Sequence, residues 1–416
     1  MVPEKFRLLE VSSFERHNCK ECYVSEESRF SLFMNPAFRF ALRSTAFVAL
    51  ALSASSCHLA QARPQWTPAQ ATAWNQANGN TWLRGSNFLP SSAINQIEMW
   101  QPSTFDEPTI DRELGYAQGL GFNSMRVFLH DLPYQQDPAG FLRRVDRFLT
   151  IADRHHIKPL FVFFDSCWYP LPYLGAQMAP RPFTHNSGWV QSPGVAALQT
   201  PAEYPRLHAY VTGVVKRFAN DPRIAGWDVW NEPDNFDGGA SARPNLEPKN
   251  KVELVNNLLP QVFAWAREAD PTQPLTSGVW KGDDWSQDAG METTSRLQLQ
   301  NSEVISFHNY GDAASLGKAI GSLRRFNRPI FCTEYMARPN KSNFNPNLGL
   351  MKAQNVAAYN WGFVSGKSQT IYPWDSWTKT YTSEPPVWFH DILRMDGSPY
   401  RPEEVAYIRG VTGAGK

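Results

Sequence analysis

The sequence WDVWNEP at residues 227–233 places an apolar run directly before a carboxylate and a proline. Proline cannot donate the backbone N–H that a strand ladder requires, so a strand is expected to end at this point. Glu232 would then lie at the carboxyl end of a buried strand. An isolated glutamate is as often a helix N-cap or a loop carboxylate, but the preceding Trp-x-x-Trp-Asn makes that interpretation less attractive here.

Outward from this motif, short apolar runs alternate with longer amphipathic stretches along residues 63–416. The apolar residues Leu142, Val145, Phe148 and Leu149 recur at spacings of three and four, as in a half-buried helix. This alternation predicts an α/β protein with a (β/α)8 TIM barrel as a single catalytic domain. A doubly wound sheet is the alternative, but no G-x-G-x-x-G follows a strand. The expected strands are Trp82–Phe88, Ser124–His130, Pro159–Asp165, Ala225–Asn231, Leu275–Trp280, Val304–Tyr310, Ile330–Tyr335 and Thr370–Trp374.

In a second motif, PIFCTEY at residues 329–335, an apolar run is again followed by a glutamate, Glu334. In the predicted barrel Glu232 follows the fourth strand and Glu334 the seventh, so the two face each other across the carboxyl-terminal mouth. Two carboxylates placed in this way are what glycoside hydrolysis requires, with one kept protonated and the other ionised.

At this point the sequence resembles the clan A glycoside hydrolases, and it is most similar to glycoside hydrolase family 5, the cellulase-like family. The resemblance covers essentially all of residues 63–416 and is carried by the order of its motifs. These are Arg126 in the second strand, Asn231-Glu232-Pro233 after the fourth, His308-x-Tyr310 in the sixth, Glu334 in the seventh and Trp374 in the eighth.

The resemblance implies a role for each of these residues. Glu232 would be the general acid/base and Glu334 the nucleophile. Asn231 would bind the substrate 2-hydroxyl, Tyr310 would steer Glu334, and Arg126 would keep Glu334 ionised by lowering its pKa.

The remaining site candidates are mostly aromatic. His308 would touch the sugar or the acid/base, and Trp374 would form the floor of the subsite where cleavage occurs. His130, Trp168 and Trp280 end or follow predicted strands and are expected to line the cleft, although capping or packing roles explain them equally well. The stretch at residues 163–168 departs from the common cellulase pattern, which leaves the subfamily and substrate open.

Composition narrows the function classes further. The 416 residues carry 40 Lys and Arg against 39 Asp and Glu, a net charge of +1, so a nucleic-acid partner is not expected. The 15 Trp suit a saccharide partner, because flat rings cover the apolar faces of sugars. No H-E-x-x-H motif is present, and neither a metal nor an organic cofactor is expected. Cys167 and Cys332 are predicted to be free thiols in a monomeric protein.

Residues 1–62 are expected to be a leader, with residues 1–33 a mis-called start and residues 34–62 a signal peptide. Met34 precedes two arginines and the apolar run at residues 46–54, which is too short to span a bilayer as a helix. The A-x-A site at residues 60–62 predicts cleavage near Ala62 and a secreted or periplasmic protein. Lipoprotein anchoring at Cys57 is the weaker alternative.

Together these observations predict a secreted retaining β-glycosidase that hydrolyses β-linked glycans such as β-1,4-glucan or β-mannan by a two-glutamate double displacement. The alternatives are a transglycosylase on the same site and a catalytically silent carbohydrate-binding protein. Two long segments, residues 167–201 and 233–250, follow the third and fourth strands. By their length they could wall off one end of the cleft and make the enzyme exo-acting.

Overall fold

The computed structural model describes residues 62–78, 81–236 and 246–414. The expectations for the leader, including Cys57, therefore lie outside the described residues, apart from Ala62. Within them, eight parallel strands form one sheet in the order β5-β4-β3-β2-β1-β8-β7-β6. The strands are β1 Arg84–Phe88, β2 Ser124–Phe128, β3 Lys158–Asp165, β4 Gly226–Asn231, β5 Leu275–Thr276, β6 Ile305–His308, β7 Ile330–Glu334 and β8 Ala357–Asn360.

The two ends of this sheet meet just after β5. The Val279 N–H donates to the Ser306 carbonyl at 3.0 Å, and the His308 N–H donates to the Val279 carbonyl at 2.9 Å. These bonds join the β5 segment to β6 and make a nearly closed barrel, so the predicted (β/α)8 fold is confirmed.

The predicted eighth strand is wrong. Residues 370–374 form a turn that leads into the 3-10 helix η4, Trp374–Trp377, whereas β8 is the preceding segment Ala357–Asn360. Ala-Ala-Tyr-Asn has little intrinsic β-propensity, and it becomes a strand because it pairs with β1 and β7 on either side. Thr370-Ile-Tyr has the composition of a strand but is followed by Pro373, and its backbone carbonyls accept from Phe389 and His390 rather than from a strand of the barrel.

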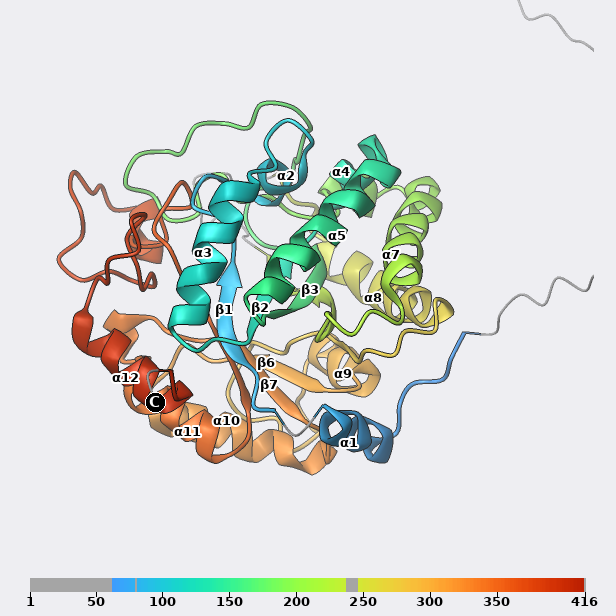
Figure 1. The fold of residues 1–416 in the computed structure, drawn as a ribbon. Helices are drawn as coiled ribbons and strands as arrows, with labels where there is room; N and C mark the ends of the chain where they lie inside the picture. Colours follow the sequence, from blue (N-terminus) through green and yellow to red (C-terminus); the bar gives the residue numbers. More distant parts are fainter. Residues whose placement is uncertain (1–61, 79–80, 237–245, 415–416) are drawn as a thin grey trace, which may run out of the picture. The chain divides into compact units, whose positions relative to one another are not determined.

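Helices surround the barrel (Figure 1). Helix α5, for example, begins at the capping residue Asp137 and Pro138 and buries Phe141, Val145, Phe148 and Leu149 on its apolar side. The α-helices are α1 Pro68–Ala77, α2 Gln96–Trp100, α3 Glu107–Gly119, α4 Asp131–Gln136, α5 Pro138–Arg154, α6 Val195–Leu198, α7 Tyr204–Phe218, α8 Lys251–Glu268, α9 Thr293–Asn301, α10 Ala313–Leu323, α11 Phe344–Ala353 and α12 Pro402–Thr412, with further 3-10 turns η1 Pro201–Glu203, η2 Arg324–Phe326 and η3 Arg338–Asn340.

The amino-terminal end of the barrel is tied to the start of the described chain. The Arg63 guanidinium donates to both carboxylate oxygens of Glu303, at 2.6 and 2.8 Å. Glu303 is fully buried just before β6 and also accepts the Leu275 N–H at the start of β5. Arg63 thus links the first described residues to two strands of the barrel.

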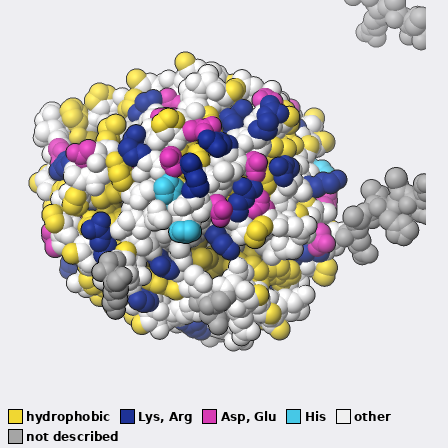
Figure 2. Space-filling view, in the orientation of Figure 1, with side chains coloured by type: hydrophobic (Ala, Val, Ile, Leu, Met, Phe, Trp, Pro, Cys, Tyr) yellow, Lys and Arg dark blue, Asp and Glu magenta, His cyan; other side chains and the backbone are white. Residues whose placement is uncertain are grey.

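The surface carries both signs of charge. On the face in front of α3 and α5, basic and acidic side chains are interspersed (Figure 2), in keeping with the balanced composition. Among the described residues no helix is both long and apolar enough to cross a bilayer. Cys167 and Cys332 are both buried free thiols, as predicted.

Candidate active site

Glu232 directly follows β4 and Glu334 is the last residue of β7, so the barrel brings both carboxylates to its carboxyl-terminal mouth. A carboxylate oxygen of each lies within 4.8 Å of the other. Both residues are buried. Glu232 has a φ of +41°, a left-handed conformation that costs free energy for a residue with a side chain. Such a conformation persists only where the surrounding structure holds it, and here it directs the carboxylate into the cleft.

Arg126 on β2 connects the strands that carry these carboxylates. Its Nη1 donates to Glu334 Oε1 at 2.8 Å, and its Nε and Nη2 donate to Asp228 Oδ2 at 3.0 and 2.8 Å. Nη2 also donates to Asn231 Oδ1 at 2.8 Å. The guanidinium is fully buried, so its charge needs these partners. Asp228 was missed in the sequence, although it lies three residues before Asn231 on the same strand.

Asn231 is fixed from the other side by β3. Its Nδ2 donates to Asp165 Oδ1 at 3.0 Å, while Asp165 Oδ2 accepts the indole N–H of Trp189 at 2.6 Å. Burial raises the pKa of Asp165 to about 6, although hydrogen bonds from Asn231 and Trp189 oppose the rise. Asp165 therefore orients one amide and one indole toward the cleft, and Trp189 is a site residue that the sequence did not reveal.

Among the described residues, the hydrogen-bond partners of the Glu232 carboxylate are neutral groups. His308 Nδ1 lies 2.9 Å from Oε1, and Asn235 Nδ2 and the Cys167 thiol donate to Oε2 at 2.7 and 3.2 Å. Burial raises the pKa of Glu232; hydrogen bonds from Asn235 and Cys167 oppose this rise, and the nearby Asp234 charge adds to it. A raised pKa is what a carboxyl needs to hold a proton near neutrality.

The Glu334 carboxylate has a cation and a phenol as partners. Arg126 holds Oε1, and the Tyr310 hydroxyl donates to Oε2 at 2.8 Å. Arg126 lowers the pKa of Glu334, as expected from the sequence. Burial, however, acts in the opposite direction and is the largest cause, so the pKa of Glu334 is raised overall. The expectation of a lowered pKa is corrected in this respect.

His308 lies between the two carboxylates. Its Nδ1 is 2.9 Å from Glu232 Oε1 and 3.5 Å from Glu334 Oε2. Burial lowers the pKa of His308 to about 4, and the Arg126 charge lowers it further while Glu334 opposes. The imidazole is therefore neutral at pH 7, and the histidine adds no positive charge between the glutamates.

A cavity of about 300 Å³ opens over these groups and is largely aromatic. Trp374, Trp280 and Trp168 line it, but Trp374 lies on η4 rather than on the eighth strand. The tryptophan that directly follows β8 is Trp361, which also lines the cavity. The residues before Trp361 lack the sequence pattern of a strand, so Trp361 was not predicted as a site residue. The lining residues are Cys167, Trp168, His185, Asn186, Trp189, Asn231, Glu232, Asn235, Trp280, Tyr310, Glu334, Trp361 and Trp374.

His130 does not line this cavity, contrary to the expectation. β2 ends at Phe128, and His130 instead caps α4 by accepting the Leu132 N–H at its Nδ1. Its Nε2 lies 3.1 Å from the Gln191 carbonyl, and the ring is fully buried. The residue supports the chain below the rim, and capping geometry explains it completely.

Glu232, His308 and Glu334 each offer one ligand atom within 4.8 Å of the others, a set that resembles a cation site. The donor set does not fit a resident metal well, because the Arg126 guanidinium already binds Glu334 at 2.8 Å and would repel a second cation.

Residues 183–380 match the family model of cellulase, glycosyl hydrolase family 5. A mannan endo-1,4-beta-mannosidase A from Emericella nidulans is 24% identical over 186 residues, which is 44% of this chain and 43% of that protein. The chain thus spans less than half the length of this curated relative.

Solved structures share the fold. An exo-beta-1,4-mannosidase from Opitutaceae bacterium strain TAV5 superposes with a TM-score of 0.54 and 17% identity, over 80% of this chain and 60% of its own. The apo structure of a beta-glucosidase gives a TM-score of 0.52 and 12% identity, over 80% of this chain and 98% of its own.

The fold is a (β/α)8 barrel, and its carboxyl-terminal mouth carries the two facing glutamates Glu232 and Glu334. Through residues 183–380, a little under half of the chain, it is similar to glycosyl hydrolase family 5, the cellulase family.

Proposed function

We propose that this protein is a secreted retaining β-glycosidase in which Glu334 is the nucleophile and Glu232 the general acid/base. The observation that carries the proposal is the separation of the carboxylates, with oxygens of Glu232 and Glu334 within 4.8 Å. Retaining enzymes hold their carboxyl groups about 5–5.5 Å apart, whereas inverting enzymes need about 6.5–9.5 Å to admit a water between them.

We assign the proton to Glu232 because the two carboxylates have different partners. Both pKa values are raised by burial, and two such close carboxylates cannot both ionise easily. Glu334 is in direct contact with the Arg126 cation, while Glu232 contacts neutral groups. The first charge therefore settles on Glu334, and Glu232 keeps the shared proton.

In the first step Glu334 attacks the anomeric carbon, the glycosidic bond breaks, and Glu232 gives its proton to the leaving oxygen. In the second step Glu232 takes a proton from water, which attacks the same carbon and releases Glu334. Asn231, held between Arg126 and Asp165, would bond the 2-hydroxyl as charge develops on the ring. Tyr310 fixes the free oxygen of Glu334.

The substrate class is a β-linked glycan such as β-1,4-glucan or β-mannan. The name of the curated relative makes β-mannosides the first to test. The expected signal peptide at residues 34–62 supports a secreted or periplasmic location, and a monomer is expected. Trp374, Trp280 and Trp168 would contact sugar, because they line the cavity over the carboxylates. His308 would contact the acid/base, since its Nδ1 lies 2.9 Å from Glu232 Oε1.

The test is an assay of the full protein on aryl β-mannosides, β-glucosides and the corresponding polysaccharides. We expect Glu334→Gln to lose at least about 10³-fold in kcat, since the nucleophile forms the covalent intermediate. The matched control is Glu253→Gln, at an exposed position on α8, which should match the wild type.

The anomeric configuration of the first product, read by NMR, checks retention. Inversion, or unchanged activity in Glu334→Gln, would refute the mechanism. Transfer products that dominate at high acceptor concentration would favour the transglycosylase. Binding without any turnover in a folded protein would favour the silent binding protein.

A further inference from the structure

The segment after β3 is tied across the barrel rim to the segment after β8. We call residues 181–190 and 366–377 together the closing wall. The Asn186 N–H donates to the Ser368 carbonyl at 2.8 Å, and the His185 N–H donates to the Ser376 hydroxyl at 3.0 Å. The Gln369 side chain accepts the Phe183 N–H and donates to the Arg181 carbonyl, both at 2.8 Å. Because β2 and β1 lie between β3 and β8 in the sheet, the closing wall spans the rim above both strands.

The segment after β1 supports this wall from below. Asn95 Nδ2 donates to the Gly188 carbonyl at 2.9 Å, and Gln96 Nε2 donates to the Val190 carbonyl at 3.1 Å. The Ser91 carbonyl accepts the Lys367 N–H at 3.0 Å. Asn95 and Gln96 are buried. The three segments are thus joined by hydrogen bonds from β1 to β3 and β8.

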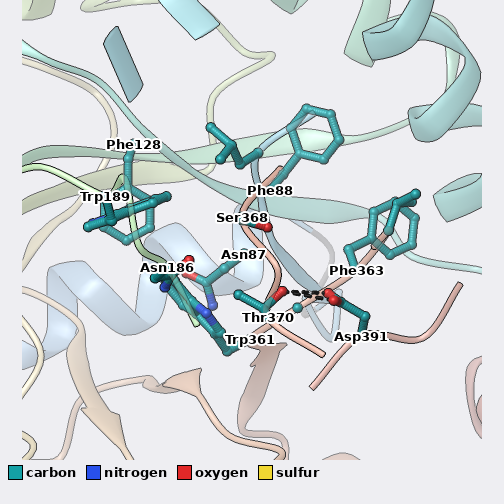
Figure 3. A pocket seen from close by; sticks show the side chains of 13 residues that line it. Asn87, Phe88, Phe128, Asn186, Trp189, Trp361, Phe363, Ser368, Thr370 and Asp391 are labelled. Carbon is teal, nitrogen blue, oxygen red and sulfur yellow. Dashed lines mark hydrogen bonds between the residues drawn. The ribbon is translucent and has the colours of Figure 1, made fainter. Parts of the chain in front are cut away.

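An aromatic cluster forms the inner surface of the wall. Trp189 meets Phe128 edge to face at 5.1 Å between ring centroids, and Trp361 lies 5.5 Å from Trp189 and 5.7 Å from Phe128. Asn186 lies beside Trp361 in the close view (Figure 3).

Behind Asn186, Trp189 and Trp361 the cavity is almost closed. A second cavity shares Asn186, Trp189 and Trp361 with the active-site cavity and continues toward Thr370 and Asp391 (Figure 3). Its volume is about 30 Å³, which is room for a water or two and not for a sugar ring. A glycan chain bound over the glutamates therefore cannot continue past the wall.

The blind end of the pocket lies on the side away from the leaving group. Glu232, the proposed proton donor, is bonded to Asn235, and Trp280 lines the same side of the cavity beyond β4 and β5. The leaving group departs toward this side, because it must receive the Glu232 proton. The sugar that is attacked thus points its non-reducing end at Asn186 and Trp361.

Unused acceptors lie at this blind end. Asn186 Oδ1 is buried and has no hydrogen-bond partner among the described residues. His185 Nδ1 lies 2.8 Å from the Tyr372 carbonyl and so carries the proton, which leaves Nε2 as an acceptor in a ring that lines the cavity. Terminal sugar hydroxyls are donors that fit such acceptors, whereas a 4-linked internal sugar has no free 4-hydroxyl.

We propose that the pocket holds one sugar unit at the non-reducing end of a β-linked glycan and that the enzyme is exo-acting. This inference rests on the proposed function, and the closing wall is the feature that determines it.

The experiment uses the full protein with β-1,4-linked mannopentaose and glucopentaose, each free and with its non-reducing 4-hydroxyl methylated, alongside the matching aryl glycosides. We expect monosaccharide and tetrasaccharide as the only products at the earliest time point, and no cleavage of the methylated chains. Internal cleavage, or cleavage of the methylated chains, would overturn the exo assignment while leaving the glycosidase proposal intact. Failure on the aryl glycosides and on every chain would instead count against the proposed function itself.

A variant pair tests the acceptor at the blind end. Asn186 has a φ of +46°, so Asn186→Gly removes the side chain without straining the backbone. We expect kcat/KM for the terminal sugar to fall about tenfold, mainly through KM, as one hydrogen bond to the sugar is lost. The matched control is Asn327→Gly, at an exposed position with a φ of +51°, which should leave kcat/KM unchanged. Equal kcat/KM values in the two variants would refute the role of Asn186.

Discussion

At the scale of single residues, the site assigns different partners to two similar carboxyls. Glu334 meets a buried cation, Arg126, which also bonds Asp228 and Asn231. Glu232 meets an amide, a thiol and a neutral imidazole. Environment of this kind is what separates an acid from a nucleophile when both groups are glutamates.

The thiol of Cys167 is the unusual member of this set and gives a residue-scale prediction. Burial raises the pKa of Cys167 well above its ordinary value, so it stays protonated and donates to Glu232 Oε2 at 3.2 Å. This donation lowers the pKa of Glu232. We expect Cys167→Ala to move the basic limb of the kcat/KM–pH profile up by about 0.5–1 pH unit.

Cys167→Ser supplies the matched comparison. A hydroxyl is a stronger donor than a thiol, so the same limb should move to lower pH or stay near the wild type. Shifts of equal size and sign in the two variants would show that packing, and not hydrogen bonding, is responsible.

At the scale of elements, α3 supports the rim from outside the barrel. Glu113 on α3 is fully buried and accepts the Ser91 N–H at 3.1 Å, and the Ser91 carbonyl in turn supports the closing wall. Burial raises the pKa of Glu113 to about 7, against opposing hydrogen bonds from Ser91.

This shift predicts a pH-dependent stability. A carboxyl whose folded pKa is raised stabilises the fold below its unfolded pKa of 4.5, and that contribution is lost as the pH rises toward 7. Glutamine mimics the neutral form at every pH. We expect Glu113→Gln to gain about 1–3 kcal/mol in the free energy of unfolding at pH 8 relative to its effect at pH 4.5. Urea denaturation at pH 4.5 and at pH 8 measures this difference in the free energy of unfolding.

The exposed Glu403→Gln on α12 serves as control and should show no such gain between the two pH values. A pH-independent effect in Glu113→Gln would mean that folding does not raise the pKa of Glu113.

The strands and helices also differ in how well they could be predicted from the sequence. Strands with long apolar runs were predictable, because a strand that is buried on both faces consists mostly of apolar residues. The positions of the two glutamates could then be predicted, because they lie at the ends of β4 and β7. β8 was not predictable, because Ala357–Asn360 becomes a strand through pairing with β1 and β7, which are far away in the sequence. The prediction for His130 was wrong for a local reason. His130 lies two residues past the end of β2, where it caps α4 by accepting the Leu132 N–H.

The partners of the site residues were the least predictable part. Trp361 was missed together with β8, and Asp228 and Trp189 acquire their roles only through contacts with Arg126 and Asp165. A single sequence carries no signal for contacts between distant strands and loops.

At the scale of the whole molecule, the chain is anchored at the end of the barrel opposite the active site. Arg63 binds Glu303, which also receives Arg267 Nε at 3.3 Å. The expected cleavage near Ala62 would leave this arginine as the first residue of the mature protein, with its side chain in place.

Arg63→Ala tests this anchor. Loss of the two charge-assisted bonds to buried Glu303 should lower the free energy of unfolding by about 1–3 kcal/mol. We expect kcat/KM to be unchanged, because the glutamates lie at the other end of the barrel. Chemical denaturation with a parallel activity assay measures both.

The control is Arg143→Ala, an exposed arginine on α5 that should cost little. Equal stability of the two variants would mean that the anchor at Glu303 contributes nothing to folding.

The closing wall also constrains the order of events in a catalytic cycle. A pocket with one mouth admits the attacking water by the path along which the leaving group departs, so the aglycone must clear before the glycosyl-enzyme can be hydrolysed. The freed monosaccharide leaves last, through the same mouth. The chain cannot slide forward by one unit while bound, and each cut therefore begins with a new encounter between enzyme and glycan end.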